Sequence, residues 1–428
     1  MSKGAAIAAV KGFRDVLPDE SRRWQDLEAA ASRVFGSYGF GEIRVPVLER
    51  TDLFARSIGD TTDIVEKEMY SFEDRDGTWV TLRPEATAGV VRAYIESGLV
   101  HRDQRARLWY AGPMFRRERP QRGRQRQFYQ IGAELFGRDD PLADAETLLM
   151  LSRFLAAVGV THARLEVNSL GDAACRPAYR ERLREFGAAH REGLCADCHR
   201  RLERNPLRLL DCKVEGCRAV MARAPLMLQH LCEPCRAHFD EVRAHLDRER
   251  VAYSVNGHMV RGLDYYCRTA FEVVGEGLGA QNALGGGGRY DGLVAALGGP
   301  DVSGIGFALG VERLSLVLGD AVAAAPGPAA VILPLADGAV APALSLATRL
   351  RDQGLQVGLE PVGRSLKALL RAADKQRARL AVIVGEDELR AGRATVRDLV
   401  RGEDRREALD LTAGGVELAR WVETEARG

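Results

Sequence analysis

The spacing of apolar and polar positions predicts both helices and strands at the start of the chain. Residues 20–38 carry a helical period. Residues 41–49 read as a strand, and Pro46 within them suits an edge strand or a bulge. Residues 78–95 predict a strand, a turn and a helix, for which Thr87 is the expected N-cap.

Two further strands flank a loop that is rich in arginine. Residues 105–115 and 126–136 both have strand patterns, and a long loop between two strands favours antiparallel pairing. A strand pattern returns at 269–275, and 303–318 predicts a strand that runs into a helix. We therefore expect an α+β domain with a mainly antiparallel sheet flanked by helices.

Composition predicts how the chain divides into domains. The segment AVAAAPGPAA, residues 321–330, indicates a linker between a domain at 1–320 and a domain at 331–428. Within the first domain, residues 170–250 are charged, helical and rich in cysteine, as an inserted module would be. Beyond the linker, strand and helix patterns alternate, which predicts a small α/β domain with a mostly parallel sheet. The overall class is then α/β.

Charge and hydropathy exclude some classes of function. The 428 residues are 46% apolar and carry a formal net charge of +1, so nucleic acid would have to bind local basic patches. The longest uncharged run, Ala321–Ala336, contains three prolines, which argues against a membrane span. The N-terminal apolar run, Ala5–Val10, is too short for a signal peptide. We expect a cytoplasmic protein that does not enter a membrane.

The strand at 126–136 has one apolar face and one mixed face. Because side chains alternate along a strand, the mixed face carries Phe128, Gln130, Gly132, Glu134 and Phe136. An amide and a carboxylate on either side of a glycine leave room for a small polar ligand. The alternative is a solvated face, although the two phenylalanines indicate that this face is covered.

The loop before this strand is strongly cationic. It holds six arginines between positions 116 and 126, and the single Glu118 cannot pair with all of them. A solvated run of charge is the usual interpretation of such a segment. Guanidinium groups also match phosphate geometry, so a nucleoside triphosphate or an RNA backbone would suit the loop.

The segment GPMFRRERPQRGRQRQFYQIGAELFG, which contains this loop and strand, resembles motif 2 of class II aminoacyl-tRNA synthetases in the form of the histidyl-tRNA synthetases. Further segments resemble landmarks of the same family in the same order, at 11–20, 38–72 (motif 1), 81–89, 261–273, 284–294 and 304–314 (motif 3). The pattern beyond the linker resembles the anticodon-binding domain of a subset of these enzymes. The resemblance covers nearly the whole chain.

This resemblance implies a histidine–tRNA ligase that works in two steps. The carboxylate of L-histidine attacks the α-phosphate of ATP, and the 3′ end of tRNA(His) then takes the histidyl group. The resemblance also implies Mg²⁺ with the ATP and, through motif 1, a homodimer. Arginines in fixed positions and a metal ion would stabilise the charge that develops on the phosphates.

The resemblance assigns roles to individual charged residues. Arg116 matches the arginine on the α-phosphate and the substrate carboxylate, Glu118 an acid near the adenine, and Arg124 a residue that reaches the outer phosphates. Arg313 matches the arginine on the γ-phosphate. Arg261 would stand beside the carboxylate and the α-phosphate, where other class II enzymes use a metal. Arg116, Arg261 and Arg313 are therefore the expected catalytic residues.

A pocket for histidine needs one acceptor and one donor for the imidazole ring. Glu134 would accept from the ring N–H, and a tyrosine hydroxyl would serve the other nitrogen. Tyr266 matches the family position better than Tyr265, and alternation suggests that these two side chains do not face the same way. The positions that match the site for the α-amino group are Glu85, Thr87 and Gln130.

Some of these residues also have ordinary structural interpretations. Arg261 could pair with Asp264, and Arg313 could be a surface arginine near a helix end. The glycines at 285–288, before Arg289, would let the backbone approach a ligand closely, or they could form a plain flexible turn.

Six of the eight cysteines fall between positions 195 and 235, as Cys195-x2-Cys198, Cys212-x4-Cys217 and Cys232-x2-Cys235. The two CxxC pairs predict a structural zinc ion. The favoured ligands are Cys195, Cys198, Cys232 and Cys235. Sets that use the middle pair, and six reduced cysteines without metal, remain as alternatives.

Two other functions compete with the ligase. The synthetase-like regulatory subunit of ATP phosphoribosyltransferase senses histidine, but it lacks the anticodon-binding domain and loses catalytic arginines. Residues 331–428 and the three expected catalytic arginines are present here. A zinc-dependent RNA-binding protein without catalysis would leave the histidine-specific segments unexplained.

Overall fold

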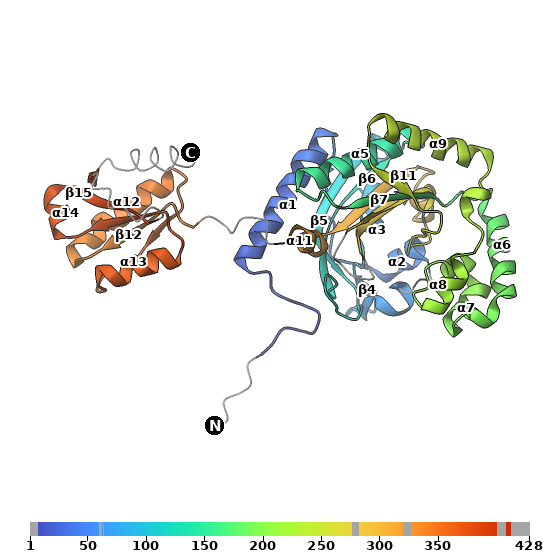
Figure 1. Ribbon diagram of the computed structural model, residues 1–428, viewed down its shortest axis with the longest axis horizontal. Helices are drawn as coiled ribbons and strands as arrows, with labels where there is room; N and C mark the ends of the chain where they lie inside the picture. Colours follow the sequence, from blue (N-terminus) through green and yellow to red (C-terminus); the bar gives the residue numbers. More distant parts are fainter. Residues whose placement is uncertain are drawn as a thin grey trace, which may run out of the picture. The chain divides into compact units, whose positions relative to one another are not determined.

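The computed structural model of the chain describes residues 7–59, 62, 64–275, 282–319, 327–399 and 408–411. Internal contacts divide the chain into two units, Met1–Val322 and Ala323–Gly428 (Figure 1). Of the predicted linker, residues 321–326 lie outside the described residues, as do residues 412–428 of the predicted second domain. No helix in the described part of the chain is both long and apolar enough to cross a membrane.

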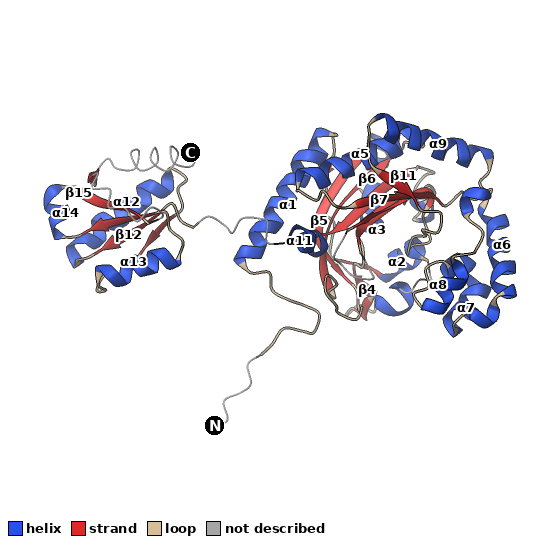
Figure 2. Cartoon of the chain, viewed as in Figure 1, coloured by secondary structure: helices blue, strands red, loops and turns tan. Residues whose placement is uncertain are grey.

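The first unit mixes strands and helices (Figure 2). Its strands are β1 (Gly41–Glu42), β2 (Leu48–Arg50), β3 (Tyr70–Glu73), β4 (Trp79–Leu82), β5 (Arg107–Phe115), β6 (Gln127–Phe136), β7 (Arg164–Ser169), β8 (Tyr253–Val255), β9 (Cys267–Val274), β10 (Ala283–Arg289) and β11 (Gly304–Gly310). Its α-helices are α1 (Pro18–Ser37), α2 (Thr51–Ile58), α3 (Thr87–Glu96), α4 (Leu99–Arg102), α5 (Pro141–Ala157), α6 (Arg176–Ala189), α7 (Ala196–Arg204), α8 (Glu215–Met221), α9 (Glu233–Arg248), α10 (Leu293–Ala296) and α11 (Val311–Leu318).

An eight-stranded sheet organises this unit. Its strand order is β1-β5-β6-β11-β10-β9-β7-β8, and only the outer pairs, β1 with β5 and β7 with β8, are parallel. The strands on either side of the arginine loop, β5 and β6, are antiparallel. Strands β2, β4 and β3 form a small antiparallel sheet. The predicted fold class, with a mainly antiparallel sheet flanked by helices, is confirmed.

The two faces of strand β6 enter different hydrophobic cores, as alternation predicts. Ile131, Ala133 and Leu135 join a large core with helices α1, α5, α9 and α11. Phe136 and the half-buried Phe128 belong to a second core under helix α3. The mixed face is therefore covered rather than solvated, and its polar groups lie in a buried site.

The inserted module begins after strand β7. Helices α6, α7 and α8 group to one side of the sheet, and α9 leads back along it (Figure 1). The module has a small core of its own in which cysteines pack among Tyr179, Leu183 and other apolar residues. Phe239, Val242 and Leu246 of α9 belong instead to the large core, so the return helix joins the module to the sheet.

The second unit holds a five-stranded sheet in the order β13-β12-β14-β15-β16. Its elements are β12 (Ala330–Pro334), α12 (Val340–Asp352), β13 (Val357–Leu359), α13 (Leu366–Lys375), β14 (Leu380–Val384), α14 (Glu386–Ala391), β15 (Arg393–Asp398) and β16 (Ala408–Asp410). The three strands foreseen in the sequence, β12, β13 and β14, are parallel to one another. Strands β15 and β16 add antiparallel pairs, so the described sheet is mixed rather than mostly parallel.

Two local predictions change in the folded chain. Pro46 separates β1 from β2, so residues 41–49 contribute to two sheets instead of one strand. Helix α3 begins at Thr87 itself, and the N-cap role predicted for that side chain is wrong. The carboxylate of Glu85 accepts the free N–H groups of Thr87 and Ala88, at 2.6 and 2.9 Å. The Thr87 hydroxyl is thereby left for another partner.

Candidate active site

Glu134 lies at the centre of a buried set of hydroxyl groups. One carboxylate oxygen accepts hydrogen bonds from Thr87 of α3 at 2.7 Å and from Tyr110 of β5 at 3.4 Å. The other oxygen accepts from Tyr290, just after β10, at 2.6 Å. Glu134 is only 1% exposed. Three other segments therefore converge on this carboxyl group of strand β6.

Burial changes the acidity of this group. Desolvation raises the pKa of Glu134 to about 8, although hydrogen bonds from Tyr290 and Thr87 act in the opposite direction. Burial therefore favours the protonated form of this carboxyl group. A bound ligand that donates an N–H to it would favour the ionised form.

Tyr265 and Tyr266 lie next to this carboxyl group and close to each other. Their ring centroids are 4.6 Å apart, and the Tyr265 ring lies 5.9 Å from that of Tyr290. Both rings pack in the core under α3, so the expectation from strand alternation that they face different ways is wrong. The two residues precede strand β9, where the two-residue period does not apply. The Tyr265 hydroxyl is buried without a hydrogen-bond partner among the described residues.

The space beside Gly132 is not open. A side chain at this position would overlap the hydroxyl of Tyr110, which reaches across from the neighbouring strand toward Glu134. The prediction that this glycine leaves room for a ligand is therefore wrong. Gln130, one step along the same face, has a buried side-chain oxygen with no hydrogen-bond partner in the described chain. An unpaired buried acceptor of this kind suits a ligand that donates hydrogen bonds.

At the other end of strand β6 the arginine loop folds into a tight turn. Gln121 and Arg124 form an isolated bridge, and Gly123 at the turn has φ of 74°, which a glycine adopts readily. Arg124 pairs with Glu118 at 2.6 Å. Arg116 lies over the Phe128 ring at 5.3 Å and donates to the carbonyl of Pro84 at 2.9 Å. The remaining loop arginines are exposed at 117, 119 and 122, and Arg126 packs on the N-terminal segment.

Arg313 closes the cluster from helix α11. Its Nε donates to the carbonyl of Gly123 at 3.2 Å, so the tip of the arginine loop rests on the start of this helix. Burial lowers the pKa of Arg313 to about 10, and the positive charge of Arg124 acts in the same direction. Arg313 is therefore a half-buried residue inside the site, and its interpretation as a surface arginine is wrong.

Arg261 pairs with Glu272 of strand β9, and its guanidinium lies 5.7 Å from the centre of the Tyr266 ring. It rests directly on strand β10, because a side chain at Gly286 would come within 2.9 Å of Arg261 Nη1. Asp264, the alternative partner, instead binds Arg208 of the inserted module at 3.1 Å. The absence of a side chain at Gly286 thus lets Arg261 pack directly on the sheet.

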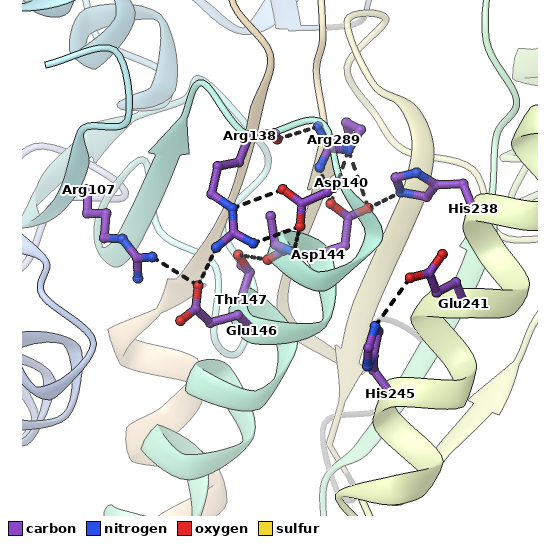
Figure 3. Close-up of polar contacts among 11 residues, drawn as sticks. Arg107, Arg138, Asp140, Asp144, Glu146, Thr147, His238, Glu241, His245 and Arg289 are labelled. Carbon is purple, nitrogen blue, oxygen red and sulfur yellow. Dashed lines mark hydrogen bonds and ion pairs between the residues drawn. The ribbon is translucent and has the colours of Figure 1, made fainter.

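The glycines at 285–288 form the middle of strand β10 and not a flexible turn. Arg289 at the end of this strand is fully buried. It pairs with the equally buried Asp144 of α5, which also binds His238 of α9 at 2.8 Å (Figure 3). Arg289 is therefore a structural cation that joins three elements.

The cysteines gather in two clusters, and the favoured zinc set is wrong. Cys195 and Cys198 lie with Cys212 and Cys217, whereas Cys232 and Cys235 lie with Asp172 and Cys175. Within each cluster the potential ligand atoms are all within 4.8 Å of one another. The pairing of the two CxxC motifs was wrong because Cys232 and Cys235 lie at the start of α9. There the chain comes back beside Asp172 and Cys175, at the beginning of the inserted module.

Several residues of the site escaped the sequence analysis. Tyr110 and Tyr290 bind Glu134, and Glu272 binds Arg261. Tyr290 lies two residues after the glycine run, so its motif could be recognised in the sequence although its role could not. Cys175 could have been found because Asp172-x2-Cys175 repeats the spacing of the CxxC pairs. Nothing in the local pattern at Tyr110 or Glu272 distinguishes them from ordinary strand residues.

Comparison with known proteins identifies the family of the chain. Residues 12–314 match the histidyl-tRNA synthetase family, and residues 329–415 match the anticodon binding domain. The chain belongs to the histidyl-tRNA synthetase family. The family resemblance seen in the sequence is thereby confirmed, and the buried carboxyl group and the arginine cluster lie within its catalytic portion.

Individual relatives of this synthetase family are similar over almost their full lengths. The histidine–tRNA ligase of Geobacter metallireducens is 53% identical over 407 residues, 95% of this chain and 98% of that protein. The apo histidyl-tRNA synthetase of Staphylococcus aureus matches with a TM-score of 0.81 at 34% identity, covering 96% of this chain and 100% of that chain. A Bacillus halodurans structure named for both an ATP phosphoribosyltransferase regulatory subunit and a histidyl-tRNA synthetase has a TM-score of 0.64 over 88% of this chain and 97% of that chain, but its identity of 20% shows the fold alone.

Proposed function

We propose that this chain is a histidine–tRNA ligase, which joins L-histidine to ATP and then to tRNA(His). The observation that carries the proposal is the arrangement along one strand. Strand β6 has the buried acceptor Glu134 toward one end and the arginine loop before its first residue. Between them lies Gln130, whose side-chain oxygen has no hydrogen-bond partner among the described residues. At about 3.3 Å per residue, Gln130 lies about 13 Å along the strand from Glu134.

The hydroxyl-lined end suits the imidazole ring of histidine. Glu134 accepts from the ring N–H, and a tyrosine hydroxyl at 265 or 266 serves the second nitrogen. Gln130, Glu85 and the segment at Thr87 then face the α-amino group. A buried polar site of this kind rejects an amino acid that leaves its groups unpaired by about 10⁴-fold or more.

The arginine end suits the triphosphate of ATP. Arg116, Arg124 and Arg313 lie close together, and Glu118 is the carboxylate paired within the loop. Burial and the neighbouring Arg124 charge lower the pKa of Arg313. Negatively charged phosphate oxygens would stabilise the charged guanidinium of Arg313 and raise that pKa again. Arg116 and Arg261 hold the α-phosphate and the attacking carboxylate, and Glu118 faces the adenine.

Mg²⁺ would enter this site together with ATP. In the described part of the chain, the groups of three or more potential metal ligands are the two cysteine clusters. The arginine end is therefore no ready-made metal cage, which fits a small cation bound mainly by phosphate oxygens. Glu118 and Glu272, whose charges act on Arg313, are the carboxylates placed to assist. The ion would neutralise charge on the outer phosphates.

Transfer to tRNA involves the rest of the chain. We assign residues 1–320 to the catalytic domain, with the insertion at 170–250, residues 321–330 to the linker, and residues 331–428 to anticodon binding. The exposed arginines of the loop face the acceptor end of the tRNA. We place the protein in the cytoplasm as a homodimer, for which the groove between α1 and β5 is a suitable contact surface. Sedimentation of the full chain at twice its own mass tests the dimer.

Histidine-dependent exchange of pyrophosphate into ATP tests the proposed function. We expect exchange with L-histidine and none above background with glycine, because glycine offers no ring to Glu134. Equal exchange rates with histidine and glycine, or no exchange with either amino acid, would overturn the assignment.

Arg261→Ala sharpens this test. The variant should keep the fold and lose histidine-dependent exchange by about 10²-fold or more, because it removes a fixed charge at the reacting groups. Arg22→Ala, which removes an exposed arginine of helix α1, is the matched control and should exchange normally. Normal exchange by Arg261→Ala would show that Arg261 only holds Glu272.

A further inference from the structure

We propose that the inserted module binds two structural zinc ions. The ligands of the first site are Cys195, Cys198, Cys212 and Cys217, and those of the second site are Asp172, Cys175, Cys232 and Cys235. Seven of the eight cysteines of the chain are thereby used, and Cys267 lies outside both sites.

The first site has the dimensions of a tetrahedral zinc centre. A Zn–S bond of about 2.3 Å places two sulfur ligands about 3.8 Å apart, and the sulfurs of Cys195 and Cys212 are 3.9 Å apart. This is nearly twice the length of a disulfide bond. The backbone N–H of Cys195 donates to the Cys217 sulfur at 3.1 Å. Hydrogen bonds of this kind from outer groups are typical of metal ligands. Cys195 and Cys198 open helix α7, and the other two ligands come from α8 and the loop before it.

The second site has one oxygen and three sulfur ligands. The Cys175 and Cys235 sulfurs are 4.0 Å apart. Oxygen Oδ1 of Asp172 lies 3.6 Å from the Cys175 sulfur and 3.8 Å from the Cys232 sulfur. Around one zinc ion, oxygen and sulfur ligands are about 3.5 Å apart. The other oxygen of Asp172 faces Arg268 at 3.6 Å, which orients the carboxylate in the way that outer partners orient metal ligands.

The module has a physical need for such ions. Helices α6 and α7 are highly charged, and cysteines make up five of the 14 buried residues of the module core, beside leucines, methionines and Tyr179. A module of this size buries little apolar surface, so small domains commonly use metal ions or disulfides for stability. The cysteines of both clusters belong to that core or pack against it, and unbound thiols there would contribute little beyond packing.

The second site also lies beside the proposed histidine pocket. Arg176, the residue after Cys175, donates to the backbone carbonyl of Tyr266 at 2.8 Å. Arg268 exchanges backbone hydrogen bonds of 2.7 Å with Leu170 and Gly171, just before Asp172. The second ion therefore positions the segment that carries Tyr266, whereas the first ion lies wholly within the module. This coupling rests on the proposed function, but the two metal sites do not.

Metal analysis of the purified full-length protein tests the sites. We expect about two zinc ions per chain after removal of loosely bound metal, about one in Cys212→Ser and about one in Cys175→Ser. Cys267→Ser is the matched control and should keep about two. The single site predicted from spacing would leave the zinc content of Cys212→Ser and Cys175→Ser unchanged, and that result would overturn the proposal. About one ion or fewer in the wild-type protein would also overturn it.

Zinc X-ray absorption on the wild-type protein covers the case in which the variants do not fold. The two sites together predict an average of about 3.5 sulfur and 0.5 oxygen ligands per zinc. A first shell dominated by nitrogen or oxygen would exclude them.

The coupling to the pocket has its own readout. Cys175→Ser should raise the KM for histidine about tenfold with little change for ATP, and Cys212→Ser should change neither. Equal changes in the KM for histidine in the two variants would overturn the coupling of the second ion to the pocket. Absence of exchange in the wild-type protein would count against the ligase and not against the metal count.

Discussion

At the scale of single residues, Glu134 combines two properties that usually exclude each other. It is a potential anion, and it is 1% exposed in a core of aromatic rings. Three hydroxyl groups replace the water that it has lost, and each can rotate to accept or donate. The raised pKa shows that this replacement is incomplete. An N–H donated by a ligand would add a further interaction with the ionised carboxylate.

Glu134→Gln should therefore make stability less sensitive to pH. The folded pKa of about 8 lies above the ordinary value of 4.5, so between these values the unfolded chain loses a proton that the folded chain keeps. The free energy of unfolding then falls with rising pH, by up to about 1.4 kcal/mol per pH unit. Relative to the wild type, the Tm of the variant should be higher at about pH 8 than at about pH 5.

Thermal melts of both proteins at the two pH values check this expectation. The exposed Glu185→Gln is the control, because this side chain pairs with Arg182 at the surface. Its Tm difference from the wild type should not depend on pH. A pH-independent difference for Glu134→Gln as well would show that the group ionises normally in the fold.

At the scale of elements, glycines let the central strands and side chains approach closely. Gly306 of β11 lies opposite Glu134 in the ladder with β6, and a side chain there would overlap the Glu134 carboxylate. It would also come within 2.6 Å of the backbone oxygen of Ala133. Gly286 of β10 similarly leaves room for Arg261. These glycines fix where the two functional side chains lie.

Gly306→Ala should displace Glu134 and weaken the strand pairing. We expect about a 100-fold loss of histidine-dependent exchange and a stability loss of about 1–3 kcal/mol, because the packed sheet has no space for the methyl group. Gly36→Ala is the control, since its Cβ would meet nothing within 4 Å on helix α1. It should exchange normally and be no less stable. Parallel exchange assays and urea unfolding would reveal both effects, and normal histidine exchange by Gly306→Ala would contradict the crowding argument.

At the scale of the whole molecule, one buried ion pair joins the sheet to the inserted module. Arg289 ends β10, Asp144 lies on α5, and His238 lies on α9, which returns from the module (Figure 3). Burial alone would raise the pKa of Asp144, but the Arg289 charge and the His238 hydrogen bond outweigh it and lower that pKa. The stabilisation is therefore present above the ordinary aspartate pKa and is lost as the pH falls through the lowered value.

Arg289→Leu should cost about 3–5 kcal/mol of stability at neutral pH, because it leaves the Asp144 carboxylate buried with only His238 as a partner. Arg107→Leu removes an arginine from the partly exposed pair with Glu146 in the same region, and should cost about 1 kcal/mol or less. Urea unfolding of both variants measures the difference. Equal losses would show that the buried pair has no special role.

Local periodicity and contiguous motifs are enough to predict most elements and the family, because each depends on residues that are neighbours in the chain. Glu134, Arg116 and Arg313 are therefore recognisable as site candidates from their motifs alone. The bonds of Tyr110 and Tyr290 to Glu134, the pairing of Arg261 with Glu272 rather than Asp264, and the gathering of seven cysteines into two clusters arise only in the folded chain. The order of strands in the sheet brings Tyr110 and Tyr290 to Glu134, and the packing of the inserted module gathers the cysteines. Neither arrangement follows from the spacing between residues.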